Sequence, residues 1–197
     1  MNGDYLSMKI GLISDTHGLT APWEKAMVLF AGADLIIHAG DILYHPPRLG
    51  YTEGYDIPDL ADMMNACTIP MLIARGNCDS EVYEELLDVP INSPYAYNVC
   101  GGLAIMVQHG HTFYSDYIET LSRKRRVDIL VSGHTHIPHI EEIGNIVHIN
   151  PGSPSHPKWR NESGILTPTV GVINDGVISI VDIDSGLTLM HHDLRKS

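Results

Sequence analysis

The chain has 197 residues, of which 44% are hydrophobic and 18% charged, as expected for a globular protein with a sizeable core. Its formal net charge of −12, with histidines neutral, argues against attraction to a polyanion, so no nucleic-acid polymer is expected as a partner. No apolar run approaches the roughly 18 residues of a membrane span, and residues 1–7 lack the features of a signal peptide. We therefore expect a cytoplasmic protein without a membrane partner, built as one domain over residues 1–197 with a loose extension at 1–7.

Strands alternate with helices in the first half of the sequence. Short apolar runs predict strands at Lys9–Ser14, Leu35–His38 and Met71–Ala74. Helical spacing predicts helices at Pro22–Phe30, Ile57–Cys67, Glu81–Leu87 and Tyr114–Arg126. The segment Tyr44–Tyr55 is rich in Gly, Pro, His and Tyr and is interpreted as a long loop. Helices between short buried strands favour a parallel sheet.

The second half contains more strands and few helices. Predicted strands lie at Ala104–Gln108, Ile129–Val131, Val147–Asn150, Thr169–Ile173, Val177–Asp182 and Leu187–His191. The Asp175-Gly176 pair has the signal of a tight hairpin between two of these strands. Both halves are accommodated by an α/β fold in which two mixed sheets pack face to face with helices outside.

Five polar motifs follow five of the predicted strands. They are Asp15-Thr16-His17, Gly40-Asp41, Gly76-Asn77, His109-Gly110 and Gly133-His134-Thr135-His136. Taken alone, each motif has an ordinary interpretation as a turn or a cap. Together and in this order they indicate metal ligands that converge on one edge of a sheet. The set supplies seven ligands, which suit two metals better than one: Asp15, His17, Asp41, Asn77, His109, His134 and His136.

The ligand types indicate which ions the site would hold. A carboxylate has two oxygens and can bridge two cations, and Asp41 is the candidate for this position. Asn77 offers a neutral carbonyl oxygen, which limits the negative charge of the site. The imidazole nitrogens favour manganese, iron, nickel, cobalt or zinc over calcium or magnesium.

The five motifs resemble the signature of the calcineurin-like metallophosphoesterases. The variants Gly76-Asn77-Cys78-Asp79, His109-Gly110-His111 and Asn150-Pro151-Gly152-Ser153 resemble the YfcE-type phosphodiesterases within that superfamily. The similarity extends from about Met8 to Pro157. It implies a four-layer αββα sandwich, the metallo-dependent phosphatase fold, with a dinuclear centre at one end.

The resemblance also implies a division of roles among the ligands. Asp15, His17 and His136 would hold the first metal, Asn77, His109 and His134 the second, and Asp41 would bridge both. Two divalent ions, most simply Mn²⁺ and otherwise Fe, Ni, Co or Zn, would generate a bridging hydroxide that attacks a small phosphodiester. On this basis Asp41, Asn77 and His109 are catalytic as well as metal-binding, and Asn77 also contacts substrate.

One position departs from the family pattern. Many members have His directly after Gly-Asn, where it is thought to assist departure of the alcohol, whereas this chain has Cys78. A thiol can donate a proton in principle, yet a small Cys is more often a compact packing residue, and packing is the favoured interpretation of Cys78. His111 is the alternative proton donor.

Other polar residues near the motifs have two interpretations each. In the 44–55 loop, His45 and Arg48 either contact the phosphate or belong to a solvated loop or subunit contact. Asp79 either positions site residues or caps the following helix. The Asn150–Ser153 turn is expected to support the metal loops through its backbone. Without motif context, His139, His148 and His156 are interpreted as surface or packing residues.

The leading function is a divalent-metal phosphodiesterase acting on a small substrate. A phosphomonoesterase with the same site is one alternative. The other is a non-catalytic scaffold like the retromer subunit that shares this fold, against which the complete ligand set argues. Assembly into a homo-oligomer is left open.

Overall fold

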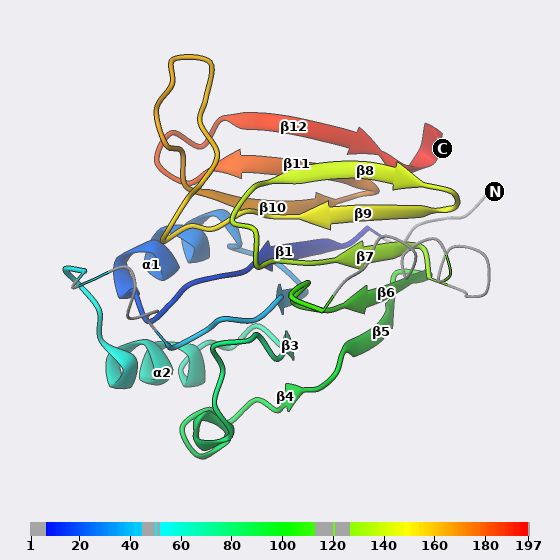
Figure 1. Ribbon diagram of the computed structural model, residues 1–197. Coiled ribbons are helices and arrows are strands. Elements are labelled where there is room, and N and C mark those ends of the chain that lie inside the picture. Colours follow the sequence, from blue (N-terminus) through cyan, green and yellow to red (C-terminus); the bar gives the residue numbers. More distant parts are fainter. Residues whose placement is uncertain (1–6, 45–49, 51, 113–119, 121–126, 197) are drawn as a thin grey trace.

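Two mixed β-sheets form the molecule (Figure 1). The computed structural model describes residues 7–44, 50, 52–112, 120 and 127–196. The seven-stranded sheet has the order β12-β11-β10-β1-β2-β3-β4, and the five-stranded sheet the order β5-β6-β7-β9-β8. The expected pair of mixed sheets is therefore confirmed.

The larger sheet has a parallel half and an antiparallel half. Strands β1 to β4 run parallel and comprise Lys9–Ile13, Leu35–His38, Met71–Ala74 and Ile91–Asn92. Strands β10 to β12 extend the sheet beyond β1, each antiparallel to the strand before it, and comprise Thr169–Asn174, Val177–Asp182 and Thr188–Asp193. Asp175 and Gly176 have φ values of 48° and 78° between paired strands, which confirms the predicted hairpin.

The smaller sheet also combines parallel and antiparallel pairs. Its strands β5 to β9 comprise Ala96–Cys100, Leu103–Val107, Ile129–Val131, His139–Ile143 and Ile146–Asn150. Strand β7 runs parallel to β6 and to β9, while the edge strands β5 and β8 are antiparallel to their neighbours. Because β1 to β3 and β6 to β7 form parallel groups, the loops at their carboxyl ends can meet at one end of the two sheets (Figure 1).

Apolar side chains fill the two layers on either side of the larger sheet. Between the sheets, Leu12 and Ile37 pack with Ile105 and Ile149 of the smaller sheet. On the other face, helices α1 (Thr20–Leu29) and α2 (Ile57–Asn65) cover the strands with side chains that include Trp23 and Leu60. Every helix within the described ranges is too short or too polar to cross a bilayer.

Most predicted elements agree with the structure to within one or two residues at each end, and one differs in kind. The helix expected at Glu81–Leu87 is a short 3₁₀ helix, Glu81–Glu85. A second 3₁₀ helix, Leu194–Lys196, ends the described chain. The sequence did not indicate β4, β5 or β8. The helix expected at Tyr114–Arg126, which would supply the fourth layer, lies almost wholly outside the described residues, as do residues 1–6 of the expected extension.

Candidate metal centre

Backbone hydrogen bonds join the loops that carry the predicted ligands. The amide of Asp15 donates to the carbonyl of Gly40 at 2.9 Å, and that of His17 to the carbonyl of Asp41 at 3.1 Å. In the smaller sheet, Gly133 donates to the carbonyl of His109 at 2.9 Å. These bonds join the first ligand loop to the second and the fourth to the fifth, although the loops lie more than 20 residues apart in the sequence.

Glycines stand where these loops approach most closely. A Cβ at Gly76 would overlap the amide nitrogen and the carboxylate of Asp41. A Cβ at Gly133 would overlap the hydroxyl of Ser14. Gly76 and Gly133 are thus needed for space. Gly40, where a Cβ would overlap the backbone of Gly76 and φ is 95°, is needed both for space and for turning the chain.

Left-handed backbone conformations are concentrated at the predicted ligands. Outside glycine, the structure has positive φ at six described residues, and five of them are predicted ligands. Such conformations cost about 1–3 kcal/mol each and persist where the surroundings enforce them, as at active sites. The five are Asp15 (57°), His17 (48°), Asp41 (56°), His134 (68°) and His136 (61°).

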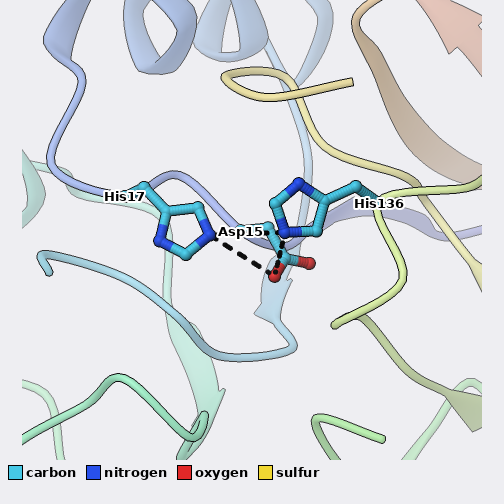
Figure 2. A group of neighbouring side chains, drawn as sticks. All are labelled: Asp15, His17 and His136. Carbon is cyan, nitrogen blue, oxygen red and sulfur yellow. Dashed lines mark hydrogen bonds and ion pairs between the residues drawn. The ribbon is translucent and has the colours of Figure 1, made fainter. Parts of the chain in front are cut away.

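The three ligands predicted for the first metal lie together (Figure 2). Oδ1 of Asp15 lies 3.3 Å from Nε2 of His136 and 3.8 Å from Nε2 of His17. The two Nε2 atoms are 3.4 Å apart. The structure thus brings Asp15, His17 and His136 together.

The imidazoles are oriented by hydrogen bonds from their other ring nitrogen. Because a carbonyl oxygen can only accept, each Nδ1 is a donor, and in a neutral ring this leaves the Nε2 lone pair directed at the centre. Metal-binding histidines are typically held in this way. The pairs are His17 with Tyr44 (2.7 Å), His109 with Ala39 (2.8 Å) and His136 with His156 (2.6 Å).

The surroundings of one buried oxygen of Asp15 show whether the site suits a cation. Oδ2 accepts hydrogen bonds from the Ser14 hydroxyl at 2.7 Å and the His134 amide at 2.9 Å. Oδ1 is buried and has no hydrogen-bond partner among the described residues. Burial opposes ionisation, but the neighbouring rings of His136 and His109 outweigh it and lower the pKa of Asp15. An ionised oxygen without a donor, faced by imidazole nitrogens, fits a metal ion.

Asp41 lies between the first group of ligands and the second. Its Oδ2 is 3.9 Å from Nε2 of His17 and 3.3 Å from Nε2 of His109, which in turn lies 3.1 Å from Oδ1 of Asn77. The pKa of Asp41 is lowered because the hydrogen bond with His109 outweighs burial. Burial opposes protonation of His109, yet the carboxylates of Asp41 and Asp15 raise its pKa to about 9. Asp41 therefore lies near ligands predicted for each of the two metals.

Two further histidines were predicted to lie near the second metal: His134 as a ligand and His111 as a proton donor. The ring centroid of His134 lies 5.2 Å from that of His109. The exposed His111 ring lies 5.5 Å from His109 and 6.1 Å from His134. His134 therefore belongs to the cluster, and His111 is at its solvent-facing rim.

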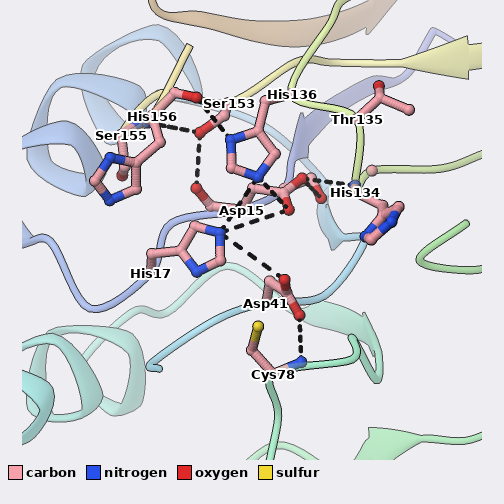
Figure 3. A network of polar contacts seen from close by, with 12 residues as sticks. Asp15, His17, Asp41, Cys78, His134, Thr135, His136, Ser153, Ser155 and His156 are labelled. Atoms are coloured by element: carbon pink, nitrogen blue, oxygen red, sulfur yellow. Dashed lines mark hydrogen bonds and ion pairs between the residues drawn. The ribbon is translucent and has the colours of Figure 1, made fainter. Parts of the chain in front are cut away.

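Cys78 lies at the centre (Figure 3). Its Sγ is grouped with ligand atoms of His17 and Asp41 that all lie within 4.8 Å of one another. The backbone amide of Cys78 donates to Oδ1 of Asp41 at 2.8 Å, and the Asn77 side chain donates to the thiol at 3.2 Å. This half-buried thiol therefore borders the predicted ligands His17 and Asp41.

Asp79 is the main supporting residue that the sequence left undecided. Its carboxylate accepts hydrogen bonds from the backbone amides of Asp41 (2.9 Å), Ile42 (2.8 Å) and Gly76 (2.8 Å). Ser80, and not Asp79, is the N-cap of the 3₁₀ helix. The capping interpretation is therefore wrong, and Asp79 joins the second and third ligand loops.

The Asn150–Ser153 turn supports the centre through side chains, and not only through its backbone as the sequence predicted. The Asn150 amide donates to the carbonyl of Gly133 at 2.7 Å, and the Ser153 hydroxyl donates to the carbonyl of Asp15 at 2.8 Å. His156, just beyond this turn, packs its ring 5.4 Å from that of His17 (Figure 3). In the sequence, only its position next to the Asn-Pro-Gly-Ser turn indicated that His156 would contact the predicted ligands.

His38 is a further supporting residue that the sequence treated only as part of an apolar strand. The Gly40 amide donates to its Nδ1 at 3.1 Å, so Nε2 carries the proton and donates to the Thr16 hydroxyl at 3.0 Å. Burial lowers the pKa of His38 to about 3, which keeps the ring neutral. His45 and Arg48, the predicted phosphate contacts, lie outside the described residues.

Several known proteins are similar to this chain in sequence and in fold. The model of the calcineurin-like phosphoesterase superfamily domain matches residues 8–171. The chain belongs to this family. That membership confirms the expected enzyme class, a metal-dependent phosphoric ester hydrolase, and the expected fold.

Individual relatives extend the likeness over almost the whole chain. The phosphodiesterase YfcE of Escherichia coli is 36% identical over 179 residues, which cover 90% of this chain and 93% of YfcE. A solved structure of Escherichia coli YfcE, described as a phosphoesterase, aligns with a TM-score of 0.81 and 32% identity over 95% of this chain and all of its own. Vacuolar protein sorting 29 of Cryptosporidium parvum, at 17% identity and a TM-score of 0.67, shares the fold; the alignment covers 95% of this chain and 98% of that one.

Proposed function

We propose that the chain hydrolyses a small phosphodiester at a centre of two divalent cations. The observation that carries this proposal is the buried Oδ1 of Asp15, which lacks a hydrogen-bond donor among the described residues and faces the Nε2 atoms of histidines. The name of YfcE, the phosphodiesterase of Escherichia coli that is 36% identical to this chain, favours a diester as the substrate.

The ligands divide into two sets that meet at one carboxylate. Asp15, His17 and His136 would hold one cation, and Asn77, His109 and His134 the other. Asp41 would contact both, since its Oδ2 lies between Nε2 of His17 and Nε2 of His109. When bound, the cations supply the positive charge that activates water and stabilises the phosphoryl oxygens. The mixture of imidazole, carboxylate and amide ligands suits Mn²⁺, with Fe, Ni, Co and Zn as alternatives.

Other residues of the chain prepare the centre for a phosphate. Backbone donors fix the carboxylates, so that their free oxygens face inward: the Cys78 amide holds Oδ1 of Asp41, and the His134 amide holds Oδ2 of Asp15. The exposed His111 is the proposed proton donor to the leaving alcohol, and Cys78 is the second candidate. His45 and Arg48 are proposed to contact the phosphate.

The test is hydrolysis of a chromogenic phosphodiester in the presence of Mn²⁺. The wild type should be active, whereas Asp41→Asn and His134→Ala should lose activity by about 100-fold or more, as expected when charge stabilisation is removed. His191→Ala, an exposed histidine of β12, is the matched control and should be unchanged. Metal-loaded wild type no more active than the two site variants would contradict an enzymatic role and favour a scaffold.

A chromogenic phosphomonoester assayed in parallel distinguishes the two ester classes. Preferential hydrolysis of the monoester would replace the phosphodiesterase assignment while keeping the same ligands. Separate measurements on His111→Ala and Cys78→Ala with good and poor leaving groups identify the proton donor, because loss of a donor should slow only the poor leaving group.

A further inference from the structure

Two histidines outside the phosphoesterase centre face each other on the smaller sheet. His139 lies on β8 and His148 on β9, and these strands are antiparallel neighbours. Nε2 of His139 lies 3.3 Å from Nδ1 of His148, and the rings are nearly perpendicular at 77°. Neither residue belongs to the five ligand motifs.

Both rings are held by further hydrogen bonds. Nε2 of His148 lies 2.8 Å from the buried hydroxyl of Ser132, which follows β7. The His139 ring is also hydrogen-bonded to the backbone of Ile137. Such bonds fix ring orientation and tautomer, and metal-binding histidines generally have them. The two rings are therefore positioned before any ligand arrives.

The same rings favour the neutral form that binds metals. Burial lowers the pKa of His139, and burial together with His139 lowers the pKa of His148 to about 4. Near pH 7 neither imidazole carries a charge, so each ring has one lone pair. A single proton lies between Nε2 of His139 and Nδ1 of His148. When a cation takes this place, the proton moves to Nε2 of His148, which then donates to the Ser132 hydroxyl, so both rings stay neutral.

A third donor stands on the same face of the sheet. Glu141 is paired with His148 across the two strands and lies two residues from His139, so all three side chains project from the same side. Its negative charge acts on His139, partly opposing the lowered pKa of that ring. Glu141 is exposed, and in the site proposed below its side chain would rotate so that the carboxylate approaches the two nitrogens.

We propose that His139, His148 and Glu141 form an additional zinc site, separate from the phosphoesterase centre. Two nitrogens bound to a tetrahedral zinc at about 2.05 Å each lie about 3.3 Å apart, which matches the separation of the two ring nitrogens. Nε2 of His139, Nδ1 of His148 and one carboxylate oxygen are three protein ligands, and water completes the coordination.

Zinc binding to the full-length chain tests this site. Zinc per chain would be measured by elemental analysis after equilibration in zinc buffers, for the wild type, His139→Gln and Glu141→Gln. His139→Gln should hold one zinc fewer than the wild type, and Glu141→Gln should bind that zinc more weakly. His191→Gln, an exposed histidine on β12, is the matched control and should bind as the wild type does.

Imidazole nitrogen NMR on the wild type locates the ion without any substitution. Zinc should shift the resonances of Nε2 of His139 and Nδ1 of His148, which become ligand nitrogens. The site is refuted if these resonances stay unchanged while zinc saturates the chain, or if folded His139→Gln holds as much zinc as the wild type. The result does not depend on the phosphodiesterase assay, in which His139→Gln should retain wild-type activity with Mn²⁺.

Discussion

Replacing Asp79 by Asn tests whether this carboxylate holds the ligand loops together. One oxygen of Asp79 accepts from the amides of Asp41 and Gly76, and the other accepts from Ile42. An Asn carbonyl can keep the first two bonds, but its NH₂ group then faces the amide of Ile42, and two donors oppose each other. The substitution therefore keeps the shape of the side chain but removes the acceptor for the Ile42 amide.

The cost follows from the hydrogen bonds. Bonds to a charged acceptor contribute about 1.5–3 kcal/mol and neutral bonds about 1 kcal/mol. The variant loses one charged bond and weakens two, while burying the neutral Asn is less costly than burying the carboxylate. We expect the free energy of unfolding to fall by about 2–4 kcal/mol. Because Asp41 and Asn77 lie on the loops that Asp79 joins, activity or metal affinity should also fall by about 10–100-fold.

Urea unfolding of the metal-free protein measures the stability change, and an Mn²⁺ titration of activity measures the effect on the centre. Asp88→Asn, at an exposed carboxylate after the 3₁₀ helix, is the matched control and should change neither. An Asp79→Asn variant with the unfolding midpoint of the wild type and an unchanged Mn²⁺ titration would refute the proposed function of this residue.

Two further substitutions test other parts of the structure. Gly76→Ala places a Cβ against the Asp41 amide and carboxylate, so the free energy of unfolding should fall by about 1–3 kcal/mol and activity should be lost. The control Gly171→Ala, crowded against the core residue Leu12, should lower stability in urea but leave activity unchanged. An equal loss of activity in the two variants would contradict a specific role of Gly76 in the metal centre. For His148, the unfolded chain takes up a proton below pH 6.5 but the fold resists it until about pH 4, so the fold loses stability as pH falls through this range. The stability advantage of the wild type over His148→Gln should shrink by about 3 kcal/mol across that window in urea unfolding, and a constant difference would contradict it.

The convergence of the ligand motifs could be predicted because it depends on a simple geometric rule. The predicted apolar runs ended directly before Asp15 and His109 and at Ala74, shortly before Asn77, and carboxyl ends of parallel strands share an edge. Strand assignment alone therefore predicted which side chains would meet. The assignment of individual ligands to one metal or the other came from the family resemblance and stays a prediction.

The missed features lack a local signal. Strand β8 has the sequence His-Ile-Glu-Glu-Ile, in which charged residues replace the apolar run, as edge strands often require. Asp79 follows a turn, where a helix cap is the ordinary interpretation, and two of its three contacts lie 37 and 38 residues away in the sequence. Contacts of this kind become visible only when the strands are placed side by side.

The conformations of the ligands indicate that the fold builds the centre before metal binds. In Asp15, His17 and Asp41 the left-handed backbone is held by hydrogen bonds between loops, and these bonds join protein atoms only. Small zinc domains differ, because there the metal supplies the folding energy. In this chain, the energy of two packed sheets holds the loops in strained conformations. Metal binding should therefore add stability to a folded protein, and removal of metal should leave the sheets intact.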